Sequence, residues 1–179
     1  MGIIQFMRIK IGKYPTHRFY HNWFGGKWIK QKVSVHIDPW DTWSMDATLA
    51  HIVVPMLERL SETTHGAPIV EDDDRPCHLL GTVVDSDSGE VDEFHFEAWD
   101  WVLDEMMFAF ESKNNDWEEQ FYSGTHDTVW IDSEVPDYSI MTKGKNDTFK
   151  IDFVGRKAYQ ERITNGFRLF GKYYENLWD

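Results

Sequence analysis

The sequence has a single cysteine, Cys77, and a shortage of basic residues. One cysteine excludes an internal disulfide and any zinc site that needs several thiolates. The 31 Asp and Glu residues outnumber the 18 Lys and Arg residues, which gives a formal net charge of −13. Proteins that bind nucleic acids neutralise the phosphates with Lys and Arg. The negative net charge therefore disfavours a nucleic-acid partner.

Long apolar runs are also missing. No segment of the sequence approaches the run of about 20 apolar residues that a membrane-spanning helix needs. The first ten residues, MGIIQFMRIK, lack the apolar centre of a secretory signal. Phe6 stands where a myristoylation signal carries Ser or Thr. The sequence therefore predicts a cytoplasmic protein without a membrane partner.

Aromatic residues, in contrast, are abundant. They make up 16% of the 179 residues and include nine tryptophans, and the hydrophobic content is 41%. This composition fits one globular domain spanning residues 1–179. Most large aromatic side chains are expected in its core. The surplus is compatible with a stacking pocket for a small ligand and with a symmetric homodimer.

Three segments have the apolar periodicity of amphipathic helices. The first runs from Met45 to about Thr63 after Ser44, a good N-cap, and Pro55 inside it predicts a kink or a break. The second covers Trp99–Glu111, and the third runs from about Arg156 to Leu177. In the second helix the predicted core face consists of Trp99, Val102, Leu103, Met106, Met107 and Phe110.

The remaining segments are predicted as strands and loops. Residues 3–11 and 32–37 are predicted to pair, and residues 127–154 to form a three-stranded meander. The acidic, turn-rich residues 66–92 are predicted to form a long loop with mobile parts. The fold class is therefore α+β, with about three long amphipathic helices packed on one face of an antiparallel sheet of about five strands. Nucleotide binding of the dinucleotide or Walker type is disfavoured because no glycine-rich phosphate loop is present.

An acidic row accompanies the second helix and allows two interpretations. It consists of Glu97, Asp100, Asp104 and Glu111, one or two helical turns apart. Carboxylates with this spacing could share a divalent cation, as a metal-dependent hydrolase of phosphorylated compounds requires. A solvated helix face is the favoured interpretation, because no second acidic row matches it. We therefore predict no metal ligands, no cofactor and no catalytic residues.

A mixed polar and aromatic set forms the predicted ligand-binding site. Its members are Asp46, His65, Trp101, Glu105, Arg162 and Asn165. Asp46 lies beside an apolar stripe, so it is expected either to be partly buried or to satisfy N–H groups of the first helical turn. Arg162 with Glu105 and Asn165 could form the wall of a pocket or a structural clamp between helices. His65 follows the first helix, whose end it could also cap.

Several segments resemble an uncharacterised family of tailed-bacteriophage proteins. These segments, which lie between about Val33 and Asp179, are DTWSMDATLAHIVVPMLERL, THGAP, WDWVLDEMMFAFE, DWEEQFYSG and RITNGFRLFGKYYENLWD. The family has no assigned activity, so the resemblance supplies no mechanism. It implies expression in the cytoplasm of an infected bacterium and a role in host takeover, evasion of host defence or virion assembly.

The sequence thus predicts a phage accessory protein that binds a small ligand without catalysis. The aromatic and charged residues favour a small ligand such as a nucleotide, and the resemblance implies that it could be a host defence signal. The first alternative is the metal-dependent hydrolase that would use the acidic row. The second alternative is a virion component or a protein that binds a host protein.

Overall fold

The computed structural model describes residues 8–10, 34–82, 90–135 and 137–178. The chain divides into two units, Met1–Thr48 and Leu49–Asp179. In the first unit, β1 (Arg8–Lys10) pairs antiparallel with β2 (Ser34–His36), which confirms the predicted pairing of these segments. A short 3-10 helix, Pro39–Thr42, follows β2.

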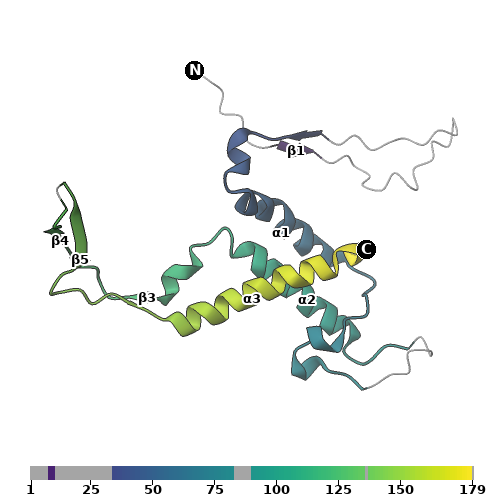
Figure 1. Ribbon diagram of the computed structural model, residues 1–179. Coiled ribbons are helices and arrows are strands. Elements are labelled where there is room, and N and C mark those ends of the chain that lie inside the picture. The colour runs from purple at the N-terminus through teal and green to yellow at the C-terminus, as the bar shows by residue number, and fades with distance from the viewer. Residues whose placement is uncertain (1–7, 11–33, 83–89, 136, 179) are drawn as a thin grey trace. The chain divides into compact units, whose positions relative to one another are not determined.

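Three helices dominate the rest of the chain (Figure 1). They are α1 (Met45–Thr63), α2 (His95–Glu111) and α3 (Phe153–Lys172), so all three predicted helices are confirmed. α1 continues through Pro55 without a break. α2 and α3 form the most extensive contact between helices. None of the helices in the described residues is long and apolar enough to cross a bilayer.

The predicted five-stranded sheet is wrong. Besides the first unit's pair, β3 (Tyr122–Ser123) pairs with β6 (Lys150–Ile151), and β4 (Thr128–Asp132) pairs with β5 (Ser139–Lys143). The described strands form separate two-stranded sheets, and the helices pack on one another instead of on a sheet.

The predicted meander fails at its third strand, because the apolar segment TFKIDFV is divided by a helix cap. Asp152 accepts hydrogen bonds from the backbone N–H groups of Val154 and Gly155, which starts α3 there. Only the part before Asp152 stays extended, and it pairs with β3 instead of β5.

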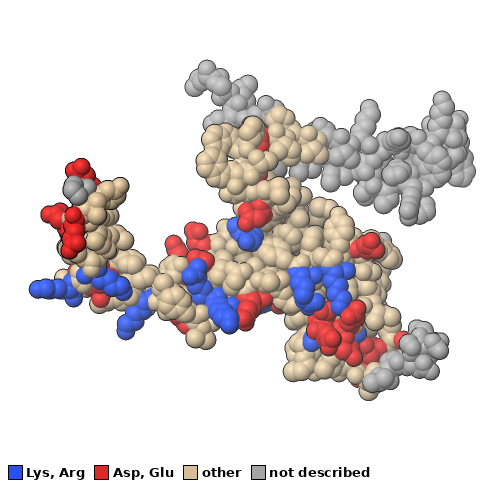
Figure 2. All heavy atoms as spheres, in the orientation of Figure 1, with Lys and Arg blue, Asp and Glu red and all other residues tan. Residues whose placement is uncertain are grey.

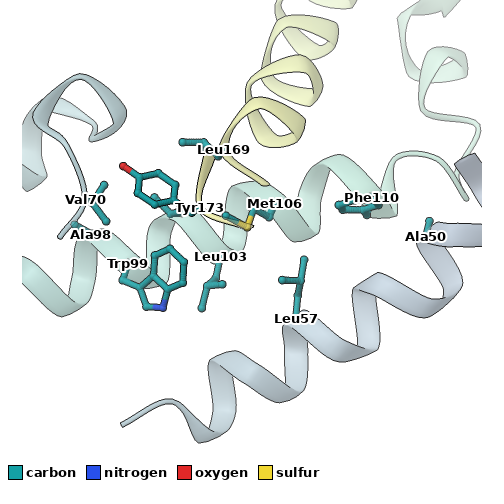
Figure 3. Close-up of a cluster of buried hydrophobic side chains, with 11 residues drawn as sticks. Ala50, Leu57, Val70, Ala98, Trp99, Leu103, Met106, Phe110, Leu169 and Tyr173 are labelled. Carbon is teal, nitrogen blue, oxygen red and sulfur yellow. The ribbon is translucent and has the colours of Figure 1, made fainter. Parts of the chain in front are cut away.

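The predicted core face of α2 is confirmed. Figure 3 shows side chains from α1, α2 and α3 and from Val70 meeting in one cluster. The large side chains with less than 2% of their surface exposed include Trp99, Leu103, Met106, Ile163, Leu169, Val70 and Val102. Phe110 is also buried, and Met107 packs at the edge of the cluster.

The predicted mobile loop is anchored over much of its length. Its described part contains two 3-10 turns, Asp72–Asp74 and Cys77–Leu79, and the side chains of Asp74 and Arg75 are buried. Residues 83–89 lie outside the described residues. An acidic composition therefore does not keep this segment in solvent, because Asp74 and Arg75 form ion pairs with other residues.

α2 and α3 cross closely at Gly166, which is buried. A Cβ at this position would overlap the backbone carbonyl oxygen of Glu105 and lie 2.6 Å from the Cβ of Ala109. A glycine is therefore required for the two helices to approach this closely. Gly171, on the same helix, has open space where a Cβ would stand.

Gly166→Ala should destabilise the fold by about 1–3 kcal/mol, because the added methyl forces the helices apart. The matched control, Gly171→Ala, should be neutral or stabilising, since alanine favours helix by up to about 1 kcal/mol over glycine. Urea denaturation of both variants measures the difference. Equal effects would show that the crossing tolerates a larger residue.

Candidate functional site

Of the six predicted ligand-binding residues, Glu105 and Arg162 are joined by direct hydrogen bonds. The guanidinium Nε lies 2.9 Å from one carboxylate oxygen of Glu105 and 3.1 Å from the other, and Nη2 lies 2.6 Å from the first. The Glu105 side chain is only 7% exposed, whereas that of Arg162 is 50% exposed. The guanidinium carbon also lies 3.7 Å from the ring centroid of Phe108. This arrangement ties α2 to α3 and favours the clamp interpretation.

The other predicted residues lie elsewhere. Asn165 accepts two hydrogen bonds from Arg168, at 3.0 and 2.9 Å, so it orients that arginine instead of Arg162. Trp101 packs against the hydrophobic core. Asp46, in the first turn of α1, is exposed, so the expected partial burial is wrong. His65 is exposed and lies beyond the end of α1.

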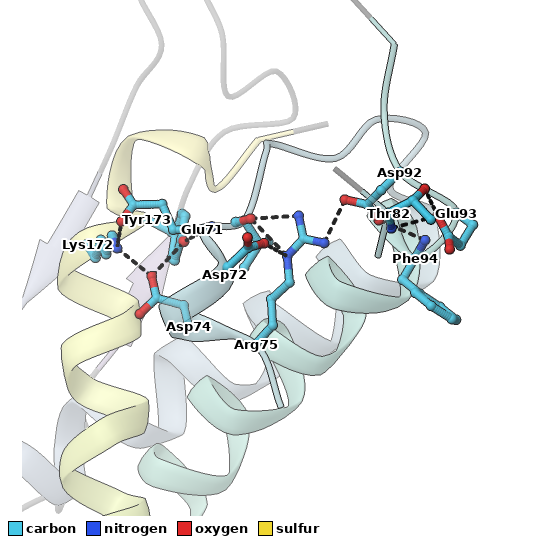
Figure 4. Close-up of polar contacts among 11 residues, drawn as sticks. Glu71, Asp72, Asp74, Arg75, Thr82, Asp92, Glu93, Phe94, Lys172 and Tyr173 are labelled. Atoms are coloured by element: carbon cyan, nitrogen blue, oxygen red, sulfur yellow. Dashed lines mark hydrogen bonds and ion pairs between the residues drawn. The ribbon is translucent and has the colours of Figure 1, made fainter. Parts of the chain in front are cut away.

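A buried carboxylate that the sequence analysis missed lies at the centre of a polar cluster. Asp74, 4% exposed, accepts hydrogen bonds from Lys172 and from the hydroxyl of Tyr173, at 2.5 and 2.8 Å (Figure 4). Arg168 adds an ion pair at 2.6 Å. Lys172 also bonds Glu71 at 2.7 Å. These contacts fasten the loop after α1 to the end of α3.

The residues that contact Asp74 determine the direction in which its pKa shifts. Burial acts to raise the pKa of Asp74, but the hydrogen bonds from Lys172, Tyr173 and Arg168 outweigh it and hold the pKa below its usual value. The hydrogen bond from Lys172 to Asp74 raises the pKa of Lys172, and the hydrogen bond to Glu71 raises it further. The sequence signal was present: Arg168 and Lys172 stand four residues apart on one side of a helix, and the chain has an EDDD run for them to meet.

Arg75 anchors the same loop from the other side. Its guanidinium donates to the carbonyl of Val70 at 2.9 and 2.6 Å and to Asp92 at 2.7 Å. A hollow of about 340 Å³ opens beside it, with the carboxylates of Glu71, Asp72, Glu90 and Asp92 among its walls. Because Arg75 is already engaged and the surrounding groups are acidic, this hollow does not suit a phosphorylated ligand.

A second hollow, an open groove of about 440 Å³, lies along α3. Its walls include Trp117 and Phe153, together with the cations of Arg156 and Lys157. Arg156 pairs with Glu118 at 2.7 Å. The groove thus combines aromatic surface with Arg and carboxylate side chains, the combination expected of a stacking site, but with residues other than those predicted.

The acidic row on α2 lies on an exposed face. Burial, and then repulsion from Asp104 and Glu97, raises the pKa of Asp100. Across the described part of the chain, no three His, Cys, Asp or Glu side chains are grouped closely enough to hold a metal ion. The geometry therefore adds no support to the hydrolase alternative.

The β4–β5 hairpin is the most unusual surface of the described residues. Trp130 lies opposite Met141, and Ile131 lies opposite Ile140. At its turn, the Ser133 N–H donates to the Tyr138 carbonyl at 3.0 Å. Asp137 in this turn has a φ of 67°, a left-handed conformation that Asp tolerates.

Both faces of this hairpin expose large apolar side chains. Side chains alternate between the faces of a strand, so Val129 and Ile131 share one face and Trp130 occupies the other. The exposed fractions are 46% for Val129, 66% for Trp130, 49% for Ile131, 52% for Ile140 and 59% for Met141. The hairpin therefore has no apolar interior of its own.

Comparisons of the chain with protein-family models, with curated proteins and with solved structures find no match. The resemblance to tailed-phage proteins accordingly stays a prediction.

Asp74→Asn should lower the free energy of unfolding at pH 7 by about 1–3 kcal/mol, because it weakens a buried, charge-assisted hydrogen-bond cluster. The depressed pKa of Asp74 means that its contribution is present above about pH 4 and is lost as the pH falls through the folded-state value. The variant should therefore lose less stability than the wild type on acidification below pH 4. Denaturant unfolding between pH 2 and 7 tests this, with the exposed Asp73→Asn as the control for charge. Parallel pH profiles for wild type and Asp74→Asn would contradict the assignment.

Arg162→Ala should cost about 3–5 kcal/mol of stability, because it leaves the buried Glu105 carboxylate without its guanidinium. Replacing both partners, in Glu105→Leu with Arg162→Ala, should recover much of this loss. The measurement is a double-mutant cycle by urea denaturation. An unchanged midpoint for Arg162→Ala would refute the clamp.

Proposed function

We propose that this chain is a binding protein without catalytic activity, that its partner is another protein, and that the β4–β5 hairpin is its binding element. The observation that carries this proposal is the exposure of large apolar side chains on both faces of the hairpin. Of the functions predicted from the sequence, this corresponds to the virion component or host-protein-binding component.

The energetics of a lone hairpin support a partner. A two-stranded sheet is marginally stable in water, and three or more strands or a covering element are needed for independent stability. Trp130 and Met141 on one face, and Val129, Ile131 and Ile140 on the other, make their fullest apolar contacts only when another molecule covers them. Binding of a protein would thus supply the burial that the hairpin lacks.

The charge distribution favours protein over nucleic acid or membrane as the partner. Acidic residues gather at the turn end of the hairpin, at Asp132, Glu134 and Asp137, and basic residues at its other end, at Lys143 and Lys145 (Figure 2). A surface with both signs of charge around an apolar centre is typical of protein interfaces. The net charge of −13 opposes binding to polyanions.

A small ligand is the second candidate, and the groove along α3 favours it. Trp117 and Phe153 offer aromatic surface for a base, and Arg156 and Lys157 offer charge for a phosphate. A nucleotide-type defence signal would fit this chemistry. It ranks second because Glu118 and Glu161 already pair with the two cations.

The resemblance to tailed-phage proteins supports placing the protein partner in an infected bacterium. The partner would then be a host protein, a protein of the virion or another phage-encoded protein, a class that includes a second copy of this chain. All of these roles are compatible with the proposed hairpin interface, and none requires a cofactor.

A photo-crosslinking amino acid at position Val129 should give discrete protein adducts when the chain is expressed in bacteria before and after phage infection. The same amino acid at Glu97, exposed on α2, is the matched control and should not give them. Ile131→Asp should abolish the adducts, because a charge on that face opposes apolar contact. Mass spectrometry identifies the products. Identical adducts from both positions would argue against the hairpin as the binding element.

A further inference from the structure

We propose that the protein bound by the hairpin is a second copy of this chain, and that the open edge of β4 pairs antiparallel with β4 of that copy about a two-fold axis at Trp130. This inference rests on the proposed function and names its partner. It is derived from the direction of the backbone groups, from the register they permit and from the charges along the edge.

The hydrogen bonds at the two ends of the hairpin establish which backbone groups face outward. Ser133 N–H donates to the Tyr138 carbonyl, and Gly144 N–H donates to the Asp127 carbonyl, at 3.0 and 2.7 Å. Hydrogen-bonded pairs alternate along an antiparallel ladder, so the odd-numbered residues from 127 to 133 face β5. Thr128, Trp130 and Asp132 therefore direct their N–H and C=O groups to the open edge of β4.

These outward groups match themselves under two-fold symmetry. With Trp130 opposite Trp130 of the second copy, Thr128 lies opposite Asp132 of that copy, and the reverse. Every outward N–H then meets an outward C=O, as an isologous interface requires. A shift of one residue would place outward groups opposite inward ones and lose these bonds.

The side chains along the edge agree with this register. It places the Asp132 carboxylate beside the Thr128 hydroxyl, so the two acids do not oppose each other. Residues 128–132 contain no Lys or Pro, the residues that usually protect an exposed edge, whereas Lys143 lies on the outer edge of β5. Val129, Trp130 and Ile131 also have high strand propensity. The edge of β4 is therefore the one that favours pairing.

The product would be a four-stranded antiparallel sheet in the order β5, β4, β4 and β5. Its one face would join the aliphatic side chains Val129, Ile131 and Ile140 of both copies, and its other face would bring the two Trp130 side chains together. Four strands exceed the number at which a sheet gains independent stability. The second copy thus pairs the open edge of β4 and brings the apolar side chains of the two hairpins side by side on each face.

Proline substitutions on the two edges test the interface. Trp130→Pro removes an outward N–H and leaves the hydrogen bonds between β4 and β5 in place, since proline is tolerated where the N–H faces away from the ladder. In sedimentation experiments on the full chain, the wild type should be dimeric, and Trp130→Pro should be monomeric. Met141→Pro, which removes an outward N–H from the opposite edge, should remain dimeric. Trp130→Thr, which keeps the donor, should also dimerise.

Charge substitutions at Thr128 test the register. Thr128→Lys places a cation opposite Asp132 of the second copy and should tighten the dimer, whereas Thr128→Asp should weaken it. With two such pairs in each dimer, roughly 2- to 30-fold changes of the dissociation constant are expected in each direction. Equal effects of the two substitutions would overturn the proposed register.

Two outcomes would overturn the second-copy inference: a wild type that stays monomeric at all concentrations, or a dimer that survives Trp130→Pro. Crosslinking from Val129 separates this failure from failure of the proposed function. Adducts with a different protein and none between two copies would overturn the second copy alone. No hairpin-specific adduct of any kind would overturn both.

Discussion

The close crossing of α2 and α3 at Gly166 is the constraint on which the described helical part depends. Because Gly166 has no Cβ, the backbone of α2 at Glu105 can approach α3 directly. The same stretch of α2 supplies the carboxylate that Arg162 binds and, one turn on, the Phe108 ring beneath the guanidinium. Steric, ionic and aromatic contacts therefore all act at one place and hold the two helices in a single relative position.

The loop between α1 and α2 shows how an acidic protein can bury acidic residues. Its anchors come from opposite directions: Lys172 and Arg168 on α3 neutralise Asp74, and Arg75 turns toward Val70 and Asp92. The contacts of Asp74 require α3 beside the loop, whereas Arg75 binds partners within the loop itself, one of them just before α2. The loop thus depends on α3 for one of its two anchors.

Local patterns in the sequence predicted the helices and the core face of α2, because the apolar period of 3.6 residues is a property of a single segment. Strand partners depend on distant segments. The prediction failed for the third strand of the meander, because Asp152 divides that apolar run into a strand and the start of a helix. The same dependence on distant segments explains why only part of the predicted ligand-binding set was placed together. Glu105 and Arg162 were matched correctly, but the environment of Asp74 requires knowing that residues 98 positions apart are neighbours.

The separation between Asp74 and Lys172 has a consequence for how the protein is made. At typical synthesis rates of roughly 5–20 residues per second, translation from Asp74 to Lys172, 98 positions later, takes about 5–20 s. During that interval Asp74 has emerged without its cations, while α2 has no α3 to cover it. The growing chain therefore exposes the apolar face that α2 turns toward α3 until α3 has been synthesised. The helical part can therefore assemble only after α3 has been synthesised.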